Sequence, residues 1–283
     1  MQIIPKIDTN NCRNLTEELS WLENYEGAEI QLLSDDFVNE TATVSNLIER
    51  FPKMKYFCFH APFSHVCLGY LLASTHYRLQ LMVYLKFLVV LASKYDLRID
   101  FLCHIQMPAN EFRGLRCAEW LKEIDQSLTG SNVRIILENS IAPLNYPLMA
   151  DDTIANLFET EELSNVVACI DVCHLHASEA VWGETIRLSE RYAAKVENIH
   201  FAYTNATEGV PYKLFTHSSP HPDSFVAGCD LVYLAGKGID LNGVRFVAEV
   251  RETDYSKREN LKKQLSVIED ALRVKTGGED DVG

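Results

Sequence analysis

The chain alternates between short apolar runs and longer segments in which apolar and polar residues recur at helical spacing. Most of the short runs are continuously apolar, which is typical of strands that helices cover on both faces. Eight of them follow one another, at residues 2–7, 28–33, 55–63, 98–105, 133–140, 165–174, 197–203 and 244–250. We therefore predict eight parallel strands.

Helix signals lie between these runs. Residues 74–96 form a long segment that is partly amphipathic and partly apolar. Residues 110–128 place Trp120 and Leu121 on one side of a helix, and residues 256–274 would form a helix with a charged face. Repeated alternation of strand and helix is typical of βαβ units. Eight such units predict an α/β fold with a single (β/α)8 TIM barrel, and a doubly wound open sheet is the structural alternative.

The length of the chain fits one barrel. Its 283 residues could form two average domains, but a barrel of this type needs about 250 residues. We expect the barrel to span residues 1–275 and a disordered tail to follow at 276–283. The stretch 204–243 is rich in Gly, Pro and Ser, and predicts an elaborated loop between the seventh and eighth strands, followed by a short helix.

Composition and charge narrow the class of protein. An apolar content of 47% with 23% charged residues is typical of a soluble globular protein. The most apolar run, 79–92, is interrupted by Lys86 and is too short to span a membrane, so we expect a cytoplasmic protein with reduced cysteines. The net charge of −14 argues against a nucleic-acid partner without excluding one, because carboxylates gathered around metal ions add to the negative total.

Polar residues end six consecutive apolar runs. In a TIM barrel the active site lies at the carboxyl ends of the strands, so the fold would bring these residues to one face. All of them can bind a cation: His60, His104, Glu138, Asp171 with His174, His200 and Glu249. Carboxylates buried there need a compensating charge, and we find no matching lysine or arginine at neighbouring strand ends. A divalent cation would supply it, and mixed imidazole and carboxylate donors favour zinc or manganese.

Three cysteines lie close to these residues. Cys169 and Cys173 are two positions on either side of Asp171, so on a single strand all three would face the same side. Together with Cys103 they are expected to pack against the wall of the pocket and not to bind metal. His176 lies beyond the polar motif and is expected to be structural.

The motifs in this order resemble those of the xylose isomerase-like TIM barrels, a superfamily of sugar isomerases and epimerases that includes the endonuclease IV type of abasic-site nuclease. The resemblance runs from about the second strand to the eighth. "FHAPF" resembles the third-strand histidine motif, "ILENS" the fifth-strand glutamate, "CIDVCH" the sixth-strand Asp-x-x-His, "NIHF" the seventh-strand histidine and "VAEV" the last glutamate. "CIDVCH" is close to the version found in the endonuclease branch.

The resemblance implies metal sites for these residues. The site common to the superfamily would consist of Glu138, Asp171, His200 and Glu249. His60 and His104 would hold another metal, with Glu138 as the bridging ligand.

For a third metal, the resemblance supplies only part of the ligand set. His174 and His217 match two of its three ligands in the endonuclease type, but the expected aspartate is missing, since Phe215 stands at that position. His221 or Asp223 is the candidate replacement.

Two enzymatic hypotheses and one non-enzymatic hypothesis follow. The favoured one is an isomerase, epimerase or related lyase acting on a small sugar or polyol, in which Glu138 and Glu249 move protons next to a metal-polarised carbonyl and His174 orients the substrate. The alternative is metal-assisted hydrolysis of a phosphoester by an endonuclease IV-like enzyme with several zinc ions, which accounts better for His60 and His104. The third is a barrel that has kept its ligands and become a binding module.

Overall fold

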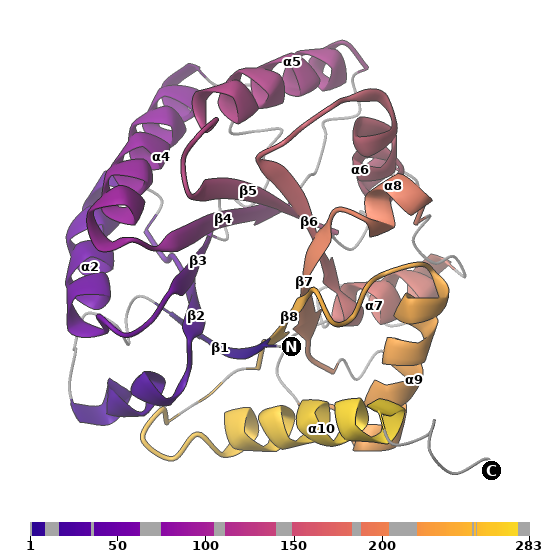
Figure 1. Cartoon of the computed structure of the whole chain (residues 1–283). Coiled ribbons are helices and arrows are strands. Elements are labelled where there is room, and N and C mark those ends of the chain that lie inside the picture. The colour runs from indigo at the N-terminus through magenta and orange to yellow at the C-terminus, as the bar shows by residue number, and fades with distance from the viewer. Residues whose placement is uncertain are drawn as a thin grey trace.

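The predicted eight-stranded barrel is confirmed. The computed structural model describes residues 2–8, 17–34, 37–62, 75–104, 111–139, 149–182, 188–203, 220–250, 252 and 254–276. Eight parallel strands, β1 to β8, follow one another in chain order around a closed barrel (Figure 1). The alternative of an open sheet is wrong, because β1 pairs with β8 in parallel over four residue positions.

The strands follow the predicted apolar runs. They are β1 (Gln2–Asp8), β2 (Gly27–Gln31), β3 (Tyr56–His60), β4 (Arg98–His104), β5 (Val133–Glu138), β6 (Val166–Asp171), β7 (Val196–Phe201) and β8 (Arg245–Ala248). One predicted run was too long. β6 ends at Asp171 and a helix begins at Val172, so the second half of "CIDVCH" is helical.

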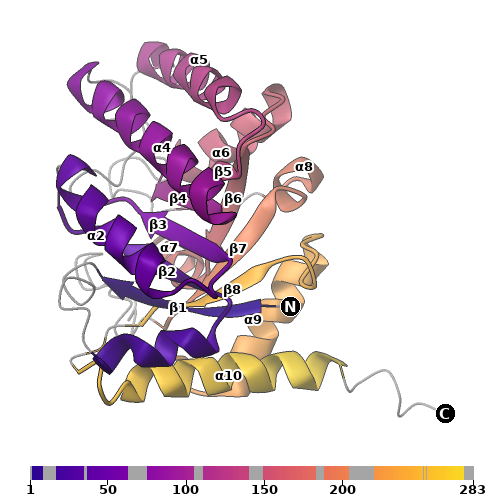
Figure 2. The ribbon, with the colours of Figure 1, turned by 60° about the vertical axis from the view of Figure 1, so that its left-hand side comes forward.

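Helices surround the barrel (Figures 1 and 2). Those described are the 3-10 helix η1 (Glu17–Asn24) and α2 (Phe37–Arg50), α4 (Thr75–Tyr95), α5 (Glu111–Ser127), α6 (Met149–Thr160), α7 (Val172–Trp182), α8 (Glu190–Ala193), α9 (Ser224–Gly236) and α10 (Glu259–Thr276). Within the predicted loop after the seventh strand, α9 forms a helix of 13 residues, and 204–219 lie outside the described residues. Of the predicted tail, 277–283 also lie outside them. None of the described helices is long and apolar enough to cross a membrane.

The apolar core has two layers, because successive residues of a strand point to opposite sides. The larger layer lies between the barrel and its helices. The smaller one fills the middle of the barrel and consists of Ile4, Tyr56, Cys58, Leu102, Ile136, Val167, Cys169 and Val247. This plug separates the amino ends of the strands from the carboxyl ends, where the cation-binding residues were predicted.

An ionic cluster closes the amino end of the barrel. Asp100 is fully buried, and its two carboxylate oxygens pair with Arg98 Nη2 at 3.1 Å and Arg134 Nε at 3.5 Å. Both guanidinium groups also pair with Glu197 of β7, and Arg245 of β8 lies 3.6 Å from the same carboxylate. Burial raises the pKa of the Asp100 carboxyl, and Arg98 partly offsets the effect. The cluster joins four strands at the end opposite the predicted site.

We predict that Asp100→Asn lowers the free energy of unfolding by about 1–3 kcal/mol, because Arg98 and Arg134 lose charged hydrogen bonds to Asp100 although Glu197 still pairs with both. Chemical denaturation measures this change. The control is Asp270→Asn, whose partner Arg273 is exposed, and for which a change below about 0.5 kcal/mol is expected. A loss below about 1 kcal/mol for Asp100→Asn would contradict the structural role of the cluster.

Candidate metal centre

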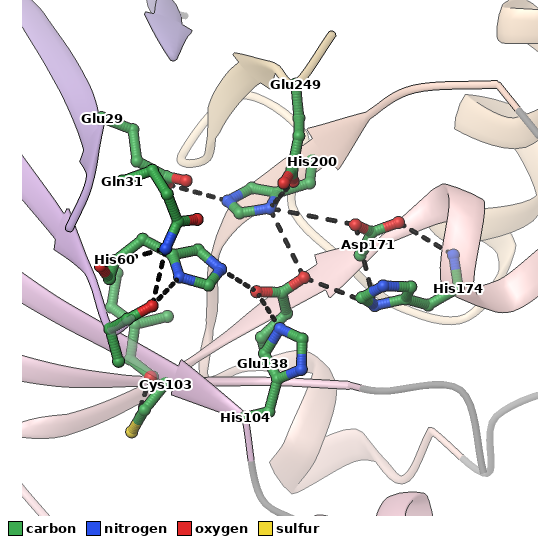
Figure 3. Close-up of polar contacts among 12 residues, drawn as sticks. Glu29, Gln31, His60, Cys103, His104, Glu138, Asp171, His174, His200 and Glu249 are labelled. Carbon is green, nitrogen blue, oxygen red and sulfur yellow. Dashed lines mark hydrogen bonds and ion pairs between the residues drawn. The ribbon is translucent and has the colours of Figure 1, made fainter. Parts of the chain in front are cut away.

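The four residues of the first predicted ligand set lie together at the carboxyl end of the barrel (Figure 3). Glu138 ends β5, Asp171 ends β6, His200 lies one residue before the end of β7 and Glu249 follows β8. All four are buried. One donor atom from each lies within 4.8 Å of the other three, which is a spacing that a single cation can span. Their role as ligands stays a prediction.

The orientation of His200 suits a metal ligand. Its Nε2 is hydrogen-bonded to Glu29 Oε2 at 2.9 Å, so Nε2 carries the proton and donates to this carboxylate. Nδ1 then points at the other predicted ligands, 2.5 Å from Glu249 Oε2 and 3.5 Å from Glu138 Oε1. A histidine that donates one N–H to a carboxylate and presents the other nitrogen to a cation is the usual arrangement in metal sites. Glu29 is therefore the residue that orients His200.

A second group of possible ligands shares Glu138. His60, His104 and Glu138 also offer three donor atoms within 4.8 Å of one another. Glu138 Oε2 lies 3.3 Å from His60 Nε2 and 3.0 Å from His104 Nε2. His60 donates its Nδ1–H to Ala61 O at 2.9 Å, which leaves its Nε2 as a lone-pair donor. The two oxygens of Glu138 thus face two different groups of donors, as Figure 3 shows.

Asn139, the residue after Glu138, holds the backbone of Asp171 at the end of β6. Asn139 Oδ1 accepts from the backbone N–H of Asp171 at 2.6 Å, and Asn139 Nδ2 donates to Asp171 O at 3.1 Å. Asp171 Oδ1 in turn accepts from His174 N at 2.9 Å, which caps the first turn of α7. His174 donates Nδ1–H to Asn139 O at 2.7 Å and lies 3.4 Å from Glu138 Oε1. The strand-to-helix turn therefore places both Asp171 and His174 against Glu138.

This turn corrects the expectation for the cysteines. Cys173 belongs to α7 and does not continue the strand from Asp171. Cys169 faces the barrel interior, but Cys103 packs between the barrel and the helices and does not line the pocket. The five cysteines whose side chains the structure describes form no disulfide with one another, in line with reduced thiols.

The expectation that no cationic side chain lies near these carboxylates is wrong. Lys6 of β1 is buried, forms an ion pair with Glu249 Oε1 and lies 3.0 Å from Glu29 Oε1. The sequence carried a signal, because Lys6 is two positions after the inward-facing Ile4 and in register with Glu29. This signal is alternation along β1, and it differs from the pattern of a polar residue ending an apolar run that predicts the other site residues.

Nearby cationic and imidazole groups lower the pKa of two of the carboxylates, Glu29 and Glu138. Burial alone would raise the pKa of Glu29, but His200 and Lys6 lower it to about 2. Burial would also raise the pKa of Glu138, and His104 with His200 holds it well below its ordinary value. Burial lowers the pKa of His200, but Cys169, Glu29 and Glu249 raise it well above its ordinary value. The centre is rich in negative charge. Its imidazole and carboxylate donors suit a divalent cation.

The residues suggested for a third metal form no ligand group with His174 within the described part of the chain, or lie outside it. His217 lies outside them. Asp223 caps α9, since its Oδ1 accepts from Val226 N at 2.9 Å. His221 is buried and its Nε2 lies 3.6 Å from Asp230 Oδ2. Within the described part of the chain, no group of three or more possible ligands joins Asp223 or His221 to His174.

We predict that Lys6→Met makes the metal-free protein less stable by about 3 kcal/mol, because Glu29 and Glu249 lose the ammonium that lies between them. The same change should tighten zinc binding, since a divalent cation then meets less competing positive charge. Denaturation of the metal-free protein and zinc calorimetry test both effects. Lys257→Met, at an exposed lysine, is the control, and weaker zinc binding by Lys6→Met would refute this account.

Comparisons with known proteins agree with the fold. A scan of protein-family models and a search of curated proteins both find no match. Among solved structures, a D-tagatose 3-epimerase-like protein superposes with a TM-score of 0.59 at 14% identity, covering 96% of this chain and 100% of that one. L-ribulose 3-epimerase gives a TM-score of 0.59 at 12% identity, covering 100% and 99%.

A nuclease lies among the similar structures as well. Endonuclease IV from Thermus thermophilus gives a TM-score of 0.55 at 14% identity, covering 95% of this chain and 100% of that one. At these identities the likeness concerns the fold. The chain has the fold of the xylose isomerase-like TIM barrels, whose known structures include both sugar epimerases and endonuclease IV.

Proposed function

We propose that this chain is a metal-dependent phosphoester hydrolase that holds two divalent cations, zinc or manganese, with Glu138 bridging them. The observation that carries the proposal is the division of Glu138 between two donor groups. Its Oε2 faces His60 and His104, and its Oε1 faces the Nδ1 atom of His200. Paired metal sites of this kind recur in phosphatases and nucleases.

The residues of the chain prepare this site. Cations held there would supply Lewis acidity to a phosphoryl oxygen and lower the pKa of an attacking water. His60 presents a neutral nitrogen, because Ala61 O accepts the N–H on the other side of its ring. His200 would present its Nδ1 in the same way to a bound cation, with Glu29 accepting the N–H of Nε2. Lys6 neutralises part of the charge of Glu29 and Glu249. The site is thus oriented before a substrate arrives.

A small phosphoester is the substrate class that the charge favours. A polyanionic nucleic acid is attracted mainly by lysine and arginine, and the net charge of this chain is −14. The described cluster of three arginines, Arg98, Arg134 and Arg245, lies at the amino end of the barrel, opposite the metal centre. The similarity to endonuclease IV supports the reaction class and not the choice of DNA.

An epimerase acting on a small sugar or polyol is the second candidate. Glu138 and Glu249 approach His200 Nδ1 from different strands, so two carboxylates flank one cation position, which suits proton transfer on either side of a substrate. The ion pair with Lys6 weakens this candidate, because it occupies one oxygen of a carboxylate that would have to transfer a proton. One cation would be enough for epimerisation, and His60 with His104 would then have no role as ligands.

We predict that Glu138→Gln lowers the affinity for zinc by at least about tenfold at both donor groups, because each loses a charged oxygen. Hydrolysis of bis-p-nitrophenyl phosphate should fall at least about a hundredfold, measured on the zinc- or manganese-loaded protein. Glu269→Gln, at an exposed glutamate on α10, is the matched control. Unchanged metal content in Glu138→Gln would refute the bridging role.

The double variant His60→Asn with His104→Asn separates the two candidates. For a hydrolase, we expect the loss of about one metal per chain and at least about a hundredfold lower phosphoester hydrolysis. The other donor group, Glu138, Asp171, His200 and Glu249, should keep its metal. Elemental analysis and the same hydrolysis assay are the measurements. An epimerase would keep its metal and its turnover of ketohexoses, and that result would replace the proposed function.

A further inference from the structure

A second cluster of titratable residues lies between α7 and α9, away from the barrel interior. It consists of His176 on α7, His221 just before α9 and Asp230 on α9. We infer that these three side chains form a separate transition-metal site that joins the two helices. The inference does not depend on the proposed hydrolase activity.

His221 is the strongest observation. Its side chain is fully buried, and within the described residues neither ring nitrogen has a hydrogen-bond partner. Its backbone N–H donates to the buried Gln264 Oε1 at 2.7 Å, and its ring packs beside Phe201 and Tyr203. An imidazole buried without a polar partner costs about 1–3 kcal/mol. A bound cation would remove that cost by taking one of the nitrogens as a ligand.

Asp230 lies between the two imidazoles. Its Oδ1 is 2.9 Å from His176 Nε2, and its Oδ2 is 3.6 Å from His221 Nε2 without making a hydrogen bond to any described residue. The two ring centroids are 6.5 Å apart. Two imidazoles and one carboxylate are a donor set that zinc commonly takes. The donor atoms of the three residues do not all lie within 4.8 Å of one another, so the two rings would have to turn toward each other around the carboxylate to bind one cation.

An adjoining cavity gives access to the cluster. It has a volume of about 250 Å³ and is lined by His176 and Asp230, together with Glu179, Cys229 and Tyr233. Glu179 lies one helical turn after His176, so it projects from the same side of α7 and can supply a further oxygen. The hydroxyl of Tyr233 has no hydrogen-bond partner among the described residues. The cavity therefore offers polar groups next to His176 and Asp230, two of the three donors.

The cluster is distinct from the barrel centre. His174 and His176 are two residues apart on α7, and at about 100° per residue their side chains point to different sides of the helix. His174 faces Glu138 and Asn139, whereas His176 faces Asp230. A cation bound to His176 and Asp230 would fix α7, which begins directly after Asp171, against α9. In this inference His176 is a ligand, whereas the sequence alone predicts a structural residue.

Zinc binding in the Glu138→Gln background tests the site, because that change weakens both donor groups of the barrel. After gel filtration, elemental analysis of Glu138→Gln should still find about one zinc per chain. Adding Asp230→Asn, His221→Gln or His176→Gln should weaken this remaining zinc at least about tenfold in calorimetry. With cobalt as the probe, the visible absorption of the bound ion should disappear in the same variants.

Asp223→Asn in the same background is the matched control. It removes one negative charge close to His221, and asparagine caps a helix as well as aspartate does. Its zinc binding should equal that of Glu138→Gln alone. If Asp230→Asn fails to fold by circular dichroism, His176→Gln decides, because that side chain is 37% exposed. Equal zinc affinity with and without His176→Gln, or no zinc in Glu138→Gln, would overturn the inference.

Discussion

The compensation of buried negative charge is the interaction on which the rest of this structure depends. Glu29, Glu138, Asp171 and Glu249 place four carboxylates in the carboxyl half of the barrel, where little water reaches them. An ionised carboxylate in such a place costs several kcal/mol unless an opposite charge lies close by. The ammonium of Lys6 supplies one such charge. The imidazoles offset part of the remainder, and a divalent cation, which this donor set could hold, would offset the rest.

The closed barrel makes this arrangement possible. Parallel strands in sequential order bring side chains that lie far apart in the chain to one end, so Lys6 of β1 meets Glu249 of β8. An apolar plug below them excludes solvent and strengthens each electrostatic contact. At the other end, Asp100 and its arginine partners form a second, independent ionic cluster. The fold thus places the ionic cluster around Asp100 at the amino end of the barrel and the candidate metal centre at the carboxyl end.

The sequence predicted the strands and the closed barrel because both depend on local patterns, whereas the resemblance to the xylose isomerase-like barrels implied the first donor set. A polar residue that ends an apolar run, such as Glu138, can be recognised in the sequence without knowing which residues lie near it in space. Lys6 and Glu29 were missed because their importance comes from facing inward on β1 and β2, which requires the strand register. The cluster of His176 and Asp230 could not be predicted, because its members come together only when α7 packs beside α9.

The charge inside the barrel also bears on the choice of substrate. Four carboxylates and one ammonium leave three negative charges when the histidines are neutral ligands. One divalent cation leaves the centre negative, which suits a neutral sugar and repels a phosphoester. Two divalent cations make it positive by one unit, which attracts an anionic phosphoester into a site of low dielectric constant. The number of cations therefore determines both the sign of the centre and the class of substrate, and His60 and His104 are the residues that decide it.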